Sequence, residues 1–123
     1  IEIQPQAIDQ ARQNATRMGI SGEWYAGAVE DVLPKLTWTS PATIILDPPR
    51  EGLHPKVAKF LATQEADQLI YVACNPKSLL RDKEILEQGN WVLEQIWSVD
   101  LFPQTPHLEL IGRFVRKEAQ NLE

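Results

Sequence analysis

Apolar and polar positions along the chain follow two patterns, one typical of helices and one typical of strands. After Pro5, which suits a first helical turn, apolar residues recur at helical spacing until Gly19, a good terminating residue. The recurring residues are Ile8, Ala11, Ala15 and Met18. The pattern predicts further helical segments at 29–36, 55–62 and 76–88, and strands at 1–3, 24–26, 43–46, 69–73, 91–100 and 108–115.

Strands and helices alternate along most of the chain, which favours an α/β fold with a mainly parallel sheet. The runs at 43–46 and 69–73 are apolar on both faces, as buried parallel strands are. No helical pattern separates the last two strands, so we expect them to be antiparallel neighbours. The length of 123 residues suits a single domain, and the polar tail after Arg116 is expected to fray.

Amino-acid composition limits the classes of protein to which the chain can belong. The chain is 43% hydrophobic and 24% charged, which is typical of globular domains. It has no apolar run of the roughly 18 residues needed to span a bilayer and no visible signal peptide, so we expect a cytoplasmic protein without a membrane anchor. The net charge of −5 indicates no basic patch, so we expect other residues to supply most of the grip on any nucleic acid.

Cys74 is the only cysteine, so an intrachain disulfide is impossible. With only His54 and His107 as further soft ligands, a Cys-rich zinc site is excluded, and we expect no metal. Cys74 follows the predicted strand at 69–73 and precedes Pro76, which marks the start of a helix. A lone cysteine is most often a small buried side chain. A helix N-terminus, however, favours the thiolate, so Cys74 is a candidate nucleophile that needs a partner.

Asp47 stands at a second strand end, where ligands bind in open α/β sheets. It directly follows the strand at 43–46, and Pro48 and Pro49 after it stiffen the backbone. Asp47 is therefore either a carboxylate held toward a ligand or a plain turn residue. Arg50 at the end of this string could pair with a carboxylate or a phosphate.

Two further segments carry candidate groups. The connection at 102–109 joins the last two strands and could deliver a base, either His107 or Glu109, or else serve only as a hairpin loop. Glu2 ends the first predicted strand, where an acidic residue can accept hydrogen bonds from ribose hydroxyls.

Three strings of the chain resemble the RNA 5-methyluridine methyltransferases, which use S-adenosylmethionine to methylate uracil C5 in transfer and ribosomal RNA. The strings are Asp47-Pro48-Pro49-Arg50, Tyr71-Val72-Ala73-Cys74-Asn75-Pro76 and Asp100-Leu101-Phe102-Pro103-Gln104-Thr105-Pro106-His107-Leu108-Glu109. Their order and spacing match the family over essentially the whole chain. Two residues depart from its pattern, Ala73 in place of Ser and Ser78 in place of Thr, and neither change removes a reacting group.

The resemblance implies a partial Rossmann-like class I methyltransferase fold that ends in an antiparallel strand pair. In that fold the last strand lies between the strands at 69–73 and 91–99. The resemblance also implies that Cys74 is the nucleophile, that Glu109 is the general base, and that Glu2 and Asp47 bind the cofactor S-adenosyl-L-methionine. The expected substrate is RNA, either tRNA or rRNA.

The chain opens on Ile1 in what looks like the middle of a strand, so we expect a fragment of a longer protein. Compared with the family, residues 1–123 form a single partial catalytic domain without the first strand, most of the second, the glycine-rich loop and the N-terminal RNA-binding region. We therefore expect the isolated chain to be inactive, to bind the cofactor weakly or not at all, and to self-associate through the exposed edge of the strand at 43–46.

Two other functions stay open. An adenine amino-methyltransferase shares Asp-Pro-Pro, but it places an aromatic residue where Arg50 stands and needs no cysteine. A non-catalytic α/β binding module would use Cys74 and Glu109 only as structural residues.

Overall fold

The computed structural model describes residues 1–117. The chain forms two compact units, Ile1–Thr37 and Trp38–Glu123. The polar tail expected to fray lies, from residue 118 on, outside the described residues. That the chain forms a single domain stays a prediction.

The first unit is built around the predicted N-terminal helix, which is α1 (Pro5–Met18). Gly19 ends it in the left-handed conformation, with a φ of 67°, and its N–H donates to the carbonyl of Thr16. Of the residues that the apolar spacing places on one face of α1, Ile8 and Ala15 are buried, whereas Met18 is 71% exposed. The predicted helical segment at 29–36 forms two short pieces, α2 (Val29–Val32) and the 3₁₀ turn η1 (Leu33–Lys35).

The predicted strands at 1–3 and 24–26 are wrong, because their pairing is limited to one isolated parallel bridge between Glu2 and Ala26. Two backbone hydrogen bonds form it, from Glu2 N to the carbonyl of Tyr25 (3.0 Å) and from Gly27 N to the carbonyl of Glu2 (2.9 Å). Toward the C-terminal end of both segments the ladder goes no further, because Pro5 begins α1 and Val29 begins α2.

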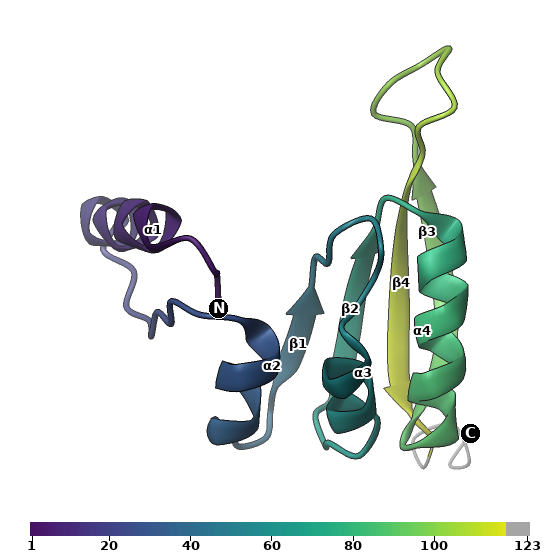
Figure 1. The fold of residues 1–123 in the computed structure, drawn as a ribbon, viewed down its shortest axis with the longest axis horizontal. Helices are drawn as coiled ribbons and strands as arrows, with labels where there is room; N and C mark the ends of the chain where they lie inside the picture. Colours follow the sequence, from purple (N-terminus) through teal and green to yellow (C-terminus); the bar gives the residue numbers. More distant parts are fainter. Residues whose placement is uncertain (118–123) are drawn as a thin grey trace. The chain divides into compact units, whose positions relative to one another are not determined.

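The second unit contains a sheet of four strands in the order β1-β2-β4-β3. The strands are β1 (Thr43–Leu46), β2 (Gln68–Ala73), β3 (Trp91–Val99) and β4 (Glu109–Arg116). β1 and β2 are parallel, and β4 is antiparallel to both β2 and β3 (Figure 1). The predicted position of the last strand, between the strands at 69–73 and 91–99, is therefore confirmed.

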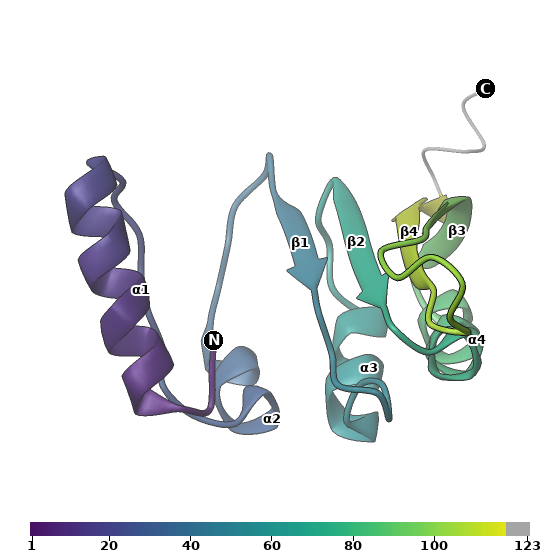
Figure 2. The same cartoon turned by 90° about the horizontal axis from the view of Figure 1, so that it is seen from above.

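Two helices, α3 (Pro55–Ala62) and α4 (Pro76–Gln88), cover one face of this sheet (Figures 1 and 2). The core lies between these layers, and its fully buried side chains include Leu61, Leu69, Tyr71, Leu79, Leu86, Trp91 and Phe114. Burial of each such apolar side chain contributes about 1.5–3 kcal/mol. The Trp91 indole N–H also donates to the carbonyl of Leu61 at 2.8 Å, so its polar atom is satisfied within the core.

β1 lies at one edge of the sheet, and the side chain of its Ile45 is 71% exposed. Self-association through this edge stays a prediction. Within residues 1–117, none of the helices has both the length and the hydrophobicity required to cross a bilayer.

Candidate active site

Three of the four predicted site residues lie at one edge of the sheet. Asp47 directly follows β1, Cys74 directly follows β2, and Glu109 is the first residue of β4. Because β1 and β2 are parallel and β4 is antiparallel to β2, these two strand ends meet the beginning of β4 (Figure 1). This is the edge at which open α/β sheets bind their ligands.

The register of the sheet brings Cys74 and Glu109 to the same end of the β2–β4 pair. The ladder ends with Ala73 paired to Leu110. Cys74 is the residue after Ala73, and Glu109 is the residue before Leu110, so both adjoin this last pair. Opposed residues of an antiparallel pair have Cβ atoms about 5 Å apart. A thiol and a carboxylate that adjoin such a pair can both reach one small ring.

Strand alternation assigns all three residues to the face of the sheet opposite α3 and α4. The buried Tyr71 faces α4, and Cys74, three residues later, falls on the other face. Leu46 pairs with Tyr71, so Asp47, one residue later, falls on that other face as well. The exposure agrees with this assignment, because Asp47 and Cys74 are exposed and Glu109 is half-buried.

Asp47 begins a tight segment, residues 47–53, which we call the Asp47 loop. The N–H of Gly52 donates to the carbonyl of Pro49 at 2.9 Å, which closes a turn. Gly52 has a φ of 87°, and a Cβ at this position would lie 2.5 Å from a guanidinium nitrogen of Arg81 and 2.6 Å from a carboxylate oxygen of Asp82. Glycine is required here for its backbone conformation and for space, so the Asp47 loop rests directly on α4.

Side chains from the beginning of α4 hold the backbone of this loop. The carbonyl of Arg50 accepts hydrogen bonds from the Asn75 amide at 3.2 Å and from the Ser78 hydroxyl at 2.5 Å. The Arg81 guanidinium donates to the carbonyl of Glu51. Ser78 is one of the two departures from the family pattern, and it keeps the hydroxyl that a threonine would offer.

Asp82 is a buried carboxylate beneath the same edge, only 1% exposed. Its Oδ2 accepts hydrogen bonds from the Tyr71 hydroxyl at 2.6 Å and from the Leu53 N–H at 2.8 Å. The Arg81 guanidinium lies 3.4 Å from its Oδ1. Burial, together with the hydrogen bond to Asp82, raises the pKa of Tyr71 far above its ordinary value. The Tyr71 hydroxyl therefore stays protonated, and remains a donor, at neutral pH.

The sequence analysis missed Asp82, although the sequence contains a signal for it. Position 82 lies three residues after Leu79 and four before Leu86, so it falls on the buried face of the predicted helix. A charged residue at such a position is costly unless it is paired and hydrogen-bonded, and it therefore predicts a partner.

A second feature outside the predicted site residues is a cluster of cations between the Asp47 loop and the beginning of α4. An open depression of about 520 Å³ is lined by Arg50, Glu51, Asn75, Lys77, Ser78 and Arg81. Three of these six residues are basic and one is acidic. The net charge of −5 gives no indication of this cluster. The basic residues come from two segments of the chain that are brought together only in the fold, and a net charge does not show such proximity.

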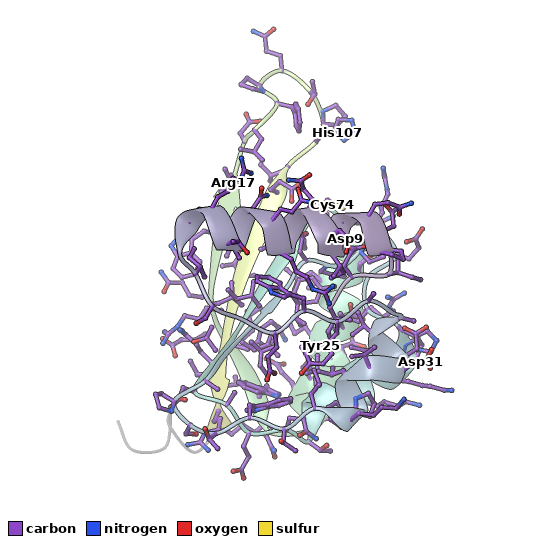
Figure 3. All side chains as sticks on the ribbon, turned by 90° about the vertical axis from the view of Figure 1, so that its left-hand side faces the viewer. Asp9, Arg17, Tyr25, Asp31, Cys74 and His107 are labelled. Carbon is purple, nitrogen blue, oxygen red and sulfur yellow. The ribbon has the colours of Figure 1, made fainter. Side chains whose placement is uncertain are left out.

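The loop between β3 and β4 extends beyond the sheet at this same edge (Figure 1). Figure 3 shows Cys74 at the end of the sheet and His107 farther out on the loop. Of the two candidate bases, His107 is exposed within the loop, whereas Glu109 is held in the sheet by its pairing with Val99. The two candidates therefore differ in how firmly they are positioned.

Glu2 belongs to the first unit, so it is described apart from the other three residues. It is exposed, and its Oε1 accepts a hydrogen bond from the N–H of Gln4 at 3.0 Å. Its role in binding the cofactor stays a prediction.

Known proteins resemble this chain in sequence and in fold. A model of the tRNA (uracil-5-)-methyltransferase family matches residues 33–118, a span that includes Asp47, Cys74 and Glu109. The chain belongs to this family. A Clostridium tetani protein described as an uncharacterized RNA methyltransferase is 36% identical over 120 residues, covering 97% of this chain. A Listeria innocua protein of the same description is 39% identical over 122 residues, covering 95% of this chain.

A solved member of the family supports the fold. The tRNA (uracil-54, C5)-methyltransferase of Pyrococcus abyssi, crystallised with S-adenosyl-L-homocysteine, matches with a TM-score of 0.75 and 31% identity over 92% of this chain. The match covers 27% of the Pyrococcus chain, and the chain spans 26% of the length of each of the two bacterial relatives. The predicted partial methyltransferase fold is therefore confirmed.

Proposed function

We propose that this chain is part of an enzyme that methylates C5 of uracil in RNA, with S-adenosylmethionine as methyl donor. The observation that carries the proposal is that Cys74 and Glu109 both adjoin the last pair of the β2–β4 ladder, at the ligand-binding edge of the sheet, in a chain that belongs to the uracil-5 methyltransferase family. A thiol and a carboxylate are the two groups that this reaction requires of a protein.

The chemistry explains that requirement. Uracil C5 is too weak a nucleophile to take a methyl group unaided. The Cys74 thiolate forms a bond to C6, and the electrons of the C5–C6 double bond shift into an enolate that makes C5 nucleophilic. C5 would then take the methyl group that the bound cofactor supplies, and the bond from that methyl carbon to the sulfonium sulfur would break to leave a thioether. The Glu109 carboxylate removes the C5 proton, the double bond forms again, and the bond from C6 to sulfur breaks to return the thiolate.

The cofactor, when bound, supplies an electrophilic methyl group. Glu2 and Asp47 are the residues proposed to hold it, with Glu2 at the ribose and Asp47 between the cofactor and the uracil. Both side chains are exposed carboxylates, which are suitable acceptors for ribose hydroxyls, so their chemistry fits the group.

The depression between the Asp47 loop and the beginning of α4 supports RNA as the substrate. Arg50, Lys77 and Arg81 line it, and such side chains bind phosphate oxygens and position a nucleic acid. The target base must leave its stack to reach Cys74. Transfer RNA is the substrate to test first, because the matching family and the Pyrococcus enzyme are both named for it, with ribosomal RNA as the alternative.

The exposed position of Cys74 also argues against the rival functions. A binding module in which the cysteine is structural would be expected to bury it. An adenine amino-methyltransferase would not require a thiol and a carboxylate at one edge of the sheet, and it would present an aromatic residue where Arg50 stands.

The test uses the complete protein that carries this chain, unmodified transfer or ribosomal RNA, and S-adenosylmethionine. Nucleosides from the digested RNA are quantified by mass spectrometry. We expect 5-methyluridine with the wild-type protein and none with Cys74→Ser, because a hydroxyl is far less ionised than a thiol near neutral pH. Methylated adenosine, or full activity of Cys74→Ser, would contradict the proposal.

A further inference from the structure

We propose that Asp82 is a positioning residue for this reaction, and that its carboxylate fixes the Asp47 loop against the strand that carries Cys74. The inference rests on the proposed function, since it assigns Asp82 a part in that same site. Asp82 lies on the face of the sheet opposite the three reacting and binding side chains, so it acts through other residues and does not touch the substrate.

Asp82 joins three segments that lead to the site. It belongs to α4, which begins two residues after Cys74. It accepts a hydrogen bond from Tyr71, three residues before Cys74 on β2, and one from Leu53, at the end of the Asp47 loop. One carboxylate thus ties the strand before the nucleophile, the helix after it and the neighbouring loop.

The arrangement fits a positioning role better than simple packing. A buried carboxylate costs several kcal/mol in desolvation unless donors surround it, and an apolar side chain could fill the same volume at lower cost. Here Oδ2 receives two donors, and the glycine at position 52 leaves room for the carboxylate to reach the loop backbone. Charge-assisted hydrogen bonds fix direction as well as distance.

The Asp47 loop is therefore held at three points. Asn75 and Ser78 hold the carbonyl of Arg50, Arg81 holds the carbonyl of Glu51, and Asp82 holds the N–H of Leu53. The attachment at Asp82 differs from the other two, because the same carboxylate also binds the Tyr71 hydroxyl of β2. Without Asp82, the end of the loop would lose this link to the strand that precedes Cys74.

Three substitutions remove successively smaller parts of the hydrogen bonding at Asp82. Asp82→Ala removes the acceptor. Asp82→Asn keeps the shape but removes the charge and places an amide near the Arg81 guanidinium. Tyr71→Phe removes only the donor from the strand and leaves the bond to Leu53. We expect kcat to fall in the order Ala, Asn, Phe from the largest loss to the smallest, with about a 10²-fold loss for Asp82→Ala, because a displacement of ~1 Å costs that much. KM for RNA should change little.

The matched control is a truncation of Leu86, which is fully buried on the same helix, four residues beyond Asp82. Leu86→Val or Leu86→Ala is chosen to match the melting temperature of Asp82→Asn. The assay is methylation by the complete protein, and a second readout is hydrogen exchange at the Leu53 amide. We expect the Asp82 variants to lose kcat and Leu53 protection together, and the Leu86 variant to keep both.

The outcomes are separable. If the wild-type protein fails to methylate RNA, the proposed function fails, while exchange at Leu53 still reports on the attachment. If the wild-type protein is active and Asp82→Asn retains its kcat, or loses no more than the Leu86 control, the positioning role is wrong. Should Asp82→Ala not fold, Asp82→Asn and Tyr71→Phe decide the question.

Discussion

Two loops leave the same edge of the sheet and are built in opposite ways. The Asp47 loop is bound to α4 by side chains from Asn75, Ser78, Arg81 and Asp82. In the loop at 101–108, the recorded hydrogen bonds are internal, from the Thr105 N–H and hydroxyl to the carbonyl of Phe102 and from His107 N to the Thr105 hydroxyl.

The exposure of the two loops differs in the same sense. Leu101 and Phe102 are each 58% exposed, although both are large apolar side chains. In the Asp47 loop, Gly52 and Leu53 are buried against α4. We infer that the two loops have different roles. The Asp47 loop fixes the positions of the reacting groups, whereas the projecting loop offers an exposed surface to the RNA substrate.

The largest effect that tests this comparison is a loss of kcat at Glu109, where the projecting loop enters the sheet. Glu109→Gln removes the proposed base, and we expect kcat to fall about 10²–10⁴-fold, as general-base deletions do. The protein–RNA adduct should accumulate because the C5 proton can no longer leave. His107→Ala, two residues away on the loop, is the matched control and should keep most of its activity. The reverse pattern would make His107 the base.

A smaller effect is expected at Phe102 in the projecting loop. Phe102→Ala removes an exposed aromatic ring, and base–aromatic stacking is worth about 1–3 kcal/mol. We expect KM for RNA to rise about tenfold, with kcat and the melting temperature little changed. A large drop in melting temperature would show that this loop is structural, and the contrast between the loops would then fail.

The attachment of the Asp47 loop can be weakened at one hydrogen bond. Ser78→Ala removes the hydroxyl bound to the Arg50 carbonyl, and we expect a loss of about 1 kcal/mol in the free energy of unfolding. Ser78→Thr keeps the hydroxyl and should restore most of that stability. Chemical denaturation measures both variants, and equal losses in the two would mean that space at this position matters more than the hydrogen bond.

The smallest effect belongs to Glu87, in the last turn of α4 and away from both loops. Burial raises the pKa of Glu87, but hydrogen bonds from the Leu93 N–H and Lys83 outweigh it and hold the pKa below the ordinary 4.5. A lowered folded-state pKa adds stability above pH 4.5, and this stability is lost as the pH falls through the lower value. Glu87→Gln should therefore be destabilised at pH 7 but much less so at pH 3, as measured by urea unfolding. Equal destabilisation at both values would contradict this.

Much of the fold could be predicted because its signals are local. The helices at 55–62 and 76–88 carry Pro at the first turn, and the strands at 43–46 and 69–73 are continuous apolar runs. Periodicity does not encode strand order, and the placement of β4 beside β2 came from the resemblance. The strand expected at 24–26 forms only an isolated bridge to Glu2 within the described residues, because a strand depends on pairing with a separate segment that its own local pattern does not show.

The site could be predicted only in part, for a similar reason. Asp47, Cys74 and Glu109 stand at strand ends, so topology alone brings them to one edge. Asp82 and the cations around Arg50 and Lys77 belong to the site because of contacts between segments about 27–30 residues apart. The pattern within one segment does not show which other segment it will contact.

The most direct test of the central claim, that Cys74 attacks the ring of a uracil, is to trap the adduct. The complete protein is incubated with S-adenosylmethionine and RNA that carries 5-fluorouridine at the target position, where fluorine replaces the proton that Glu109 must remove. The covalent complex is digested and mapped by mass spectrometry. We predict a methylated fluorouracil attached to the peptide that contains Cys74, and none with Cys74→Ser. An adduct on another residue, or methylation of ordinary RNA without any trapped adduct, would contradict the account.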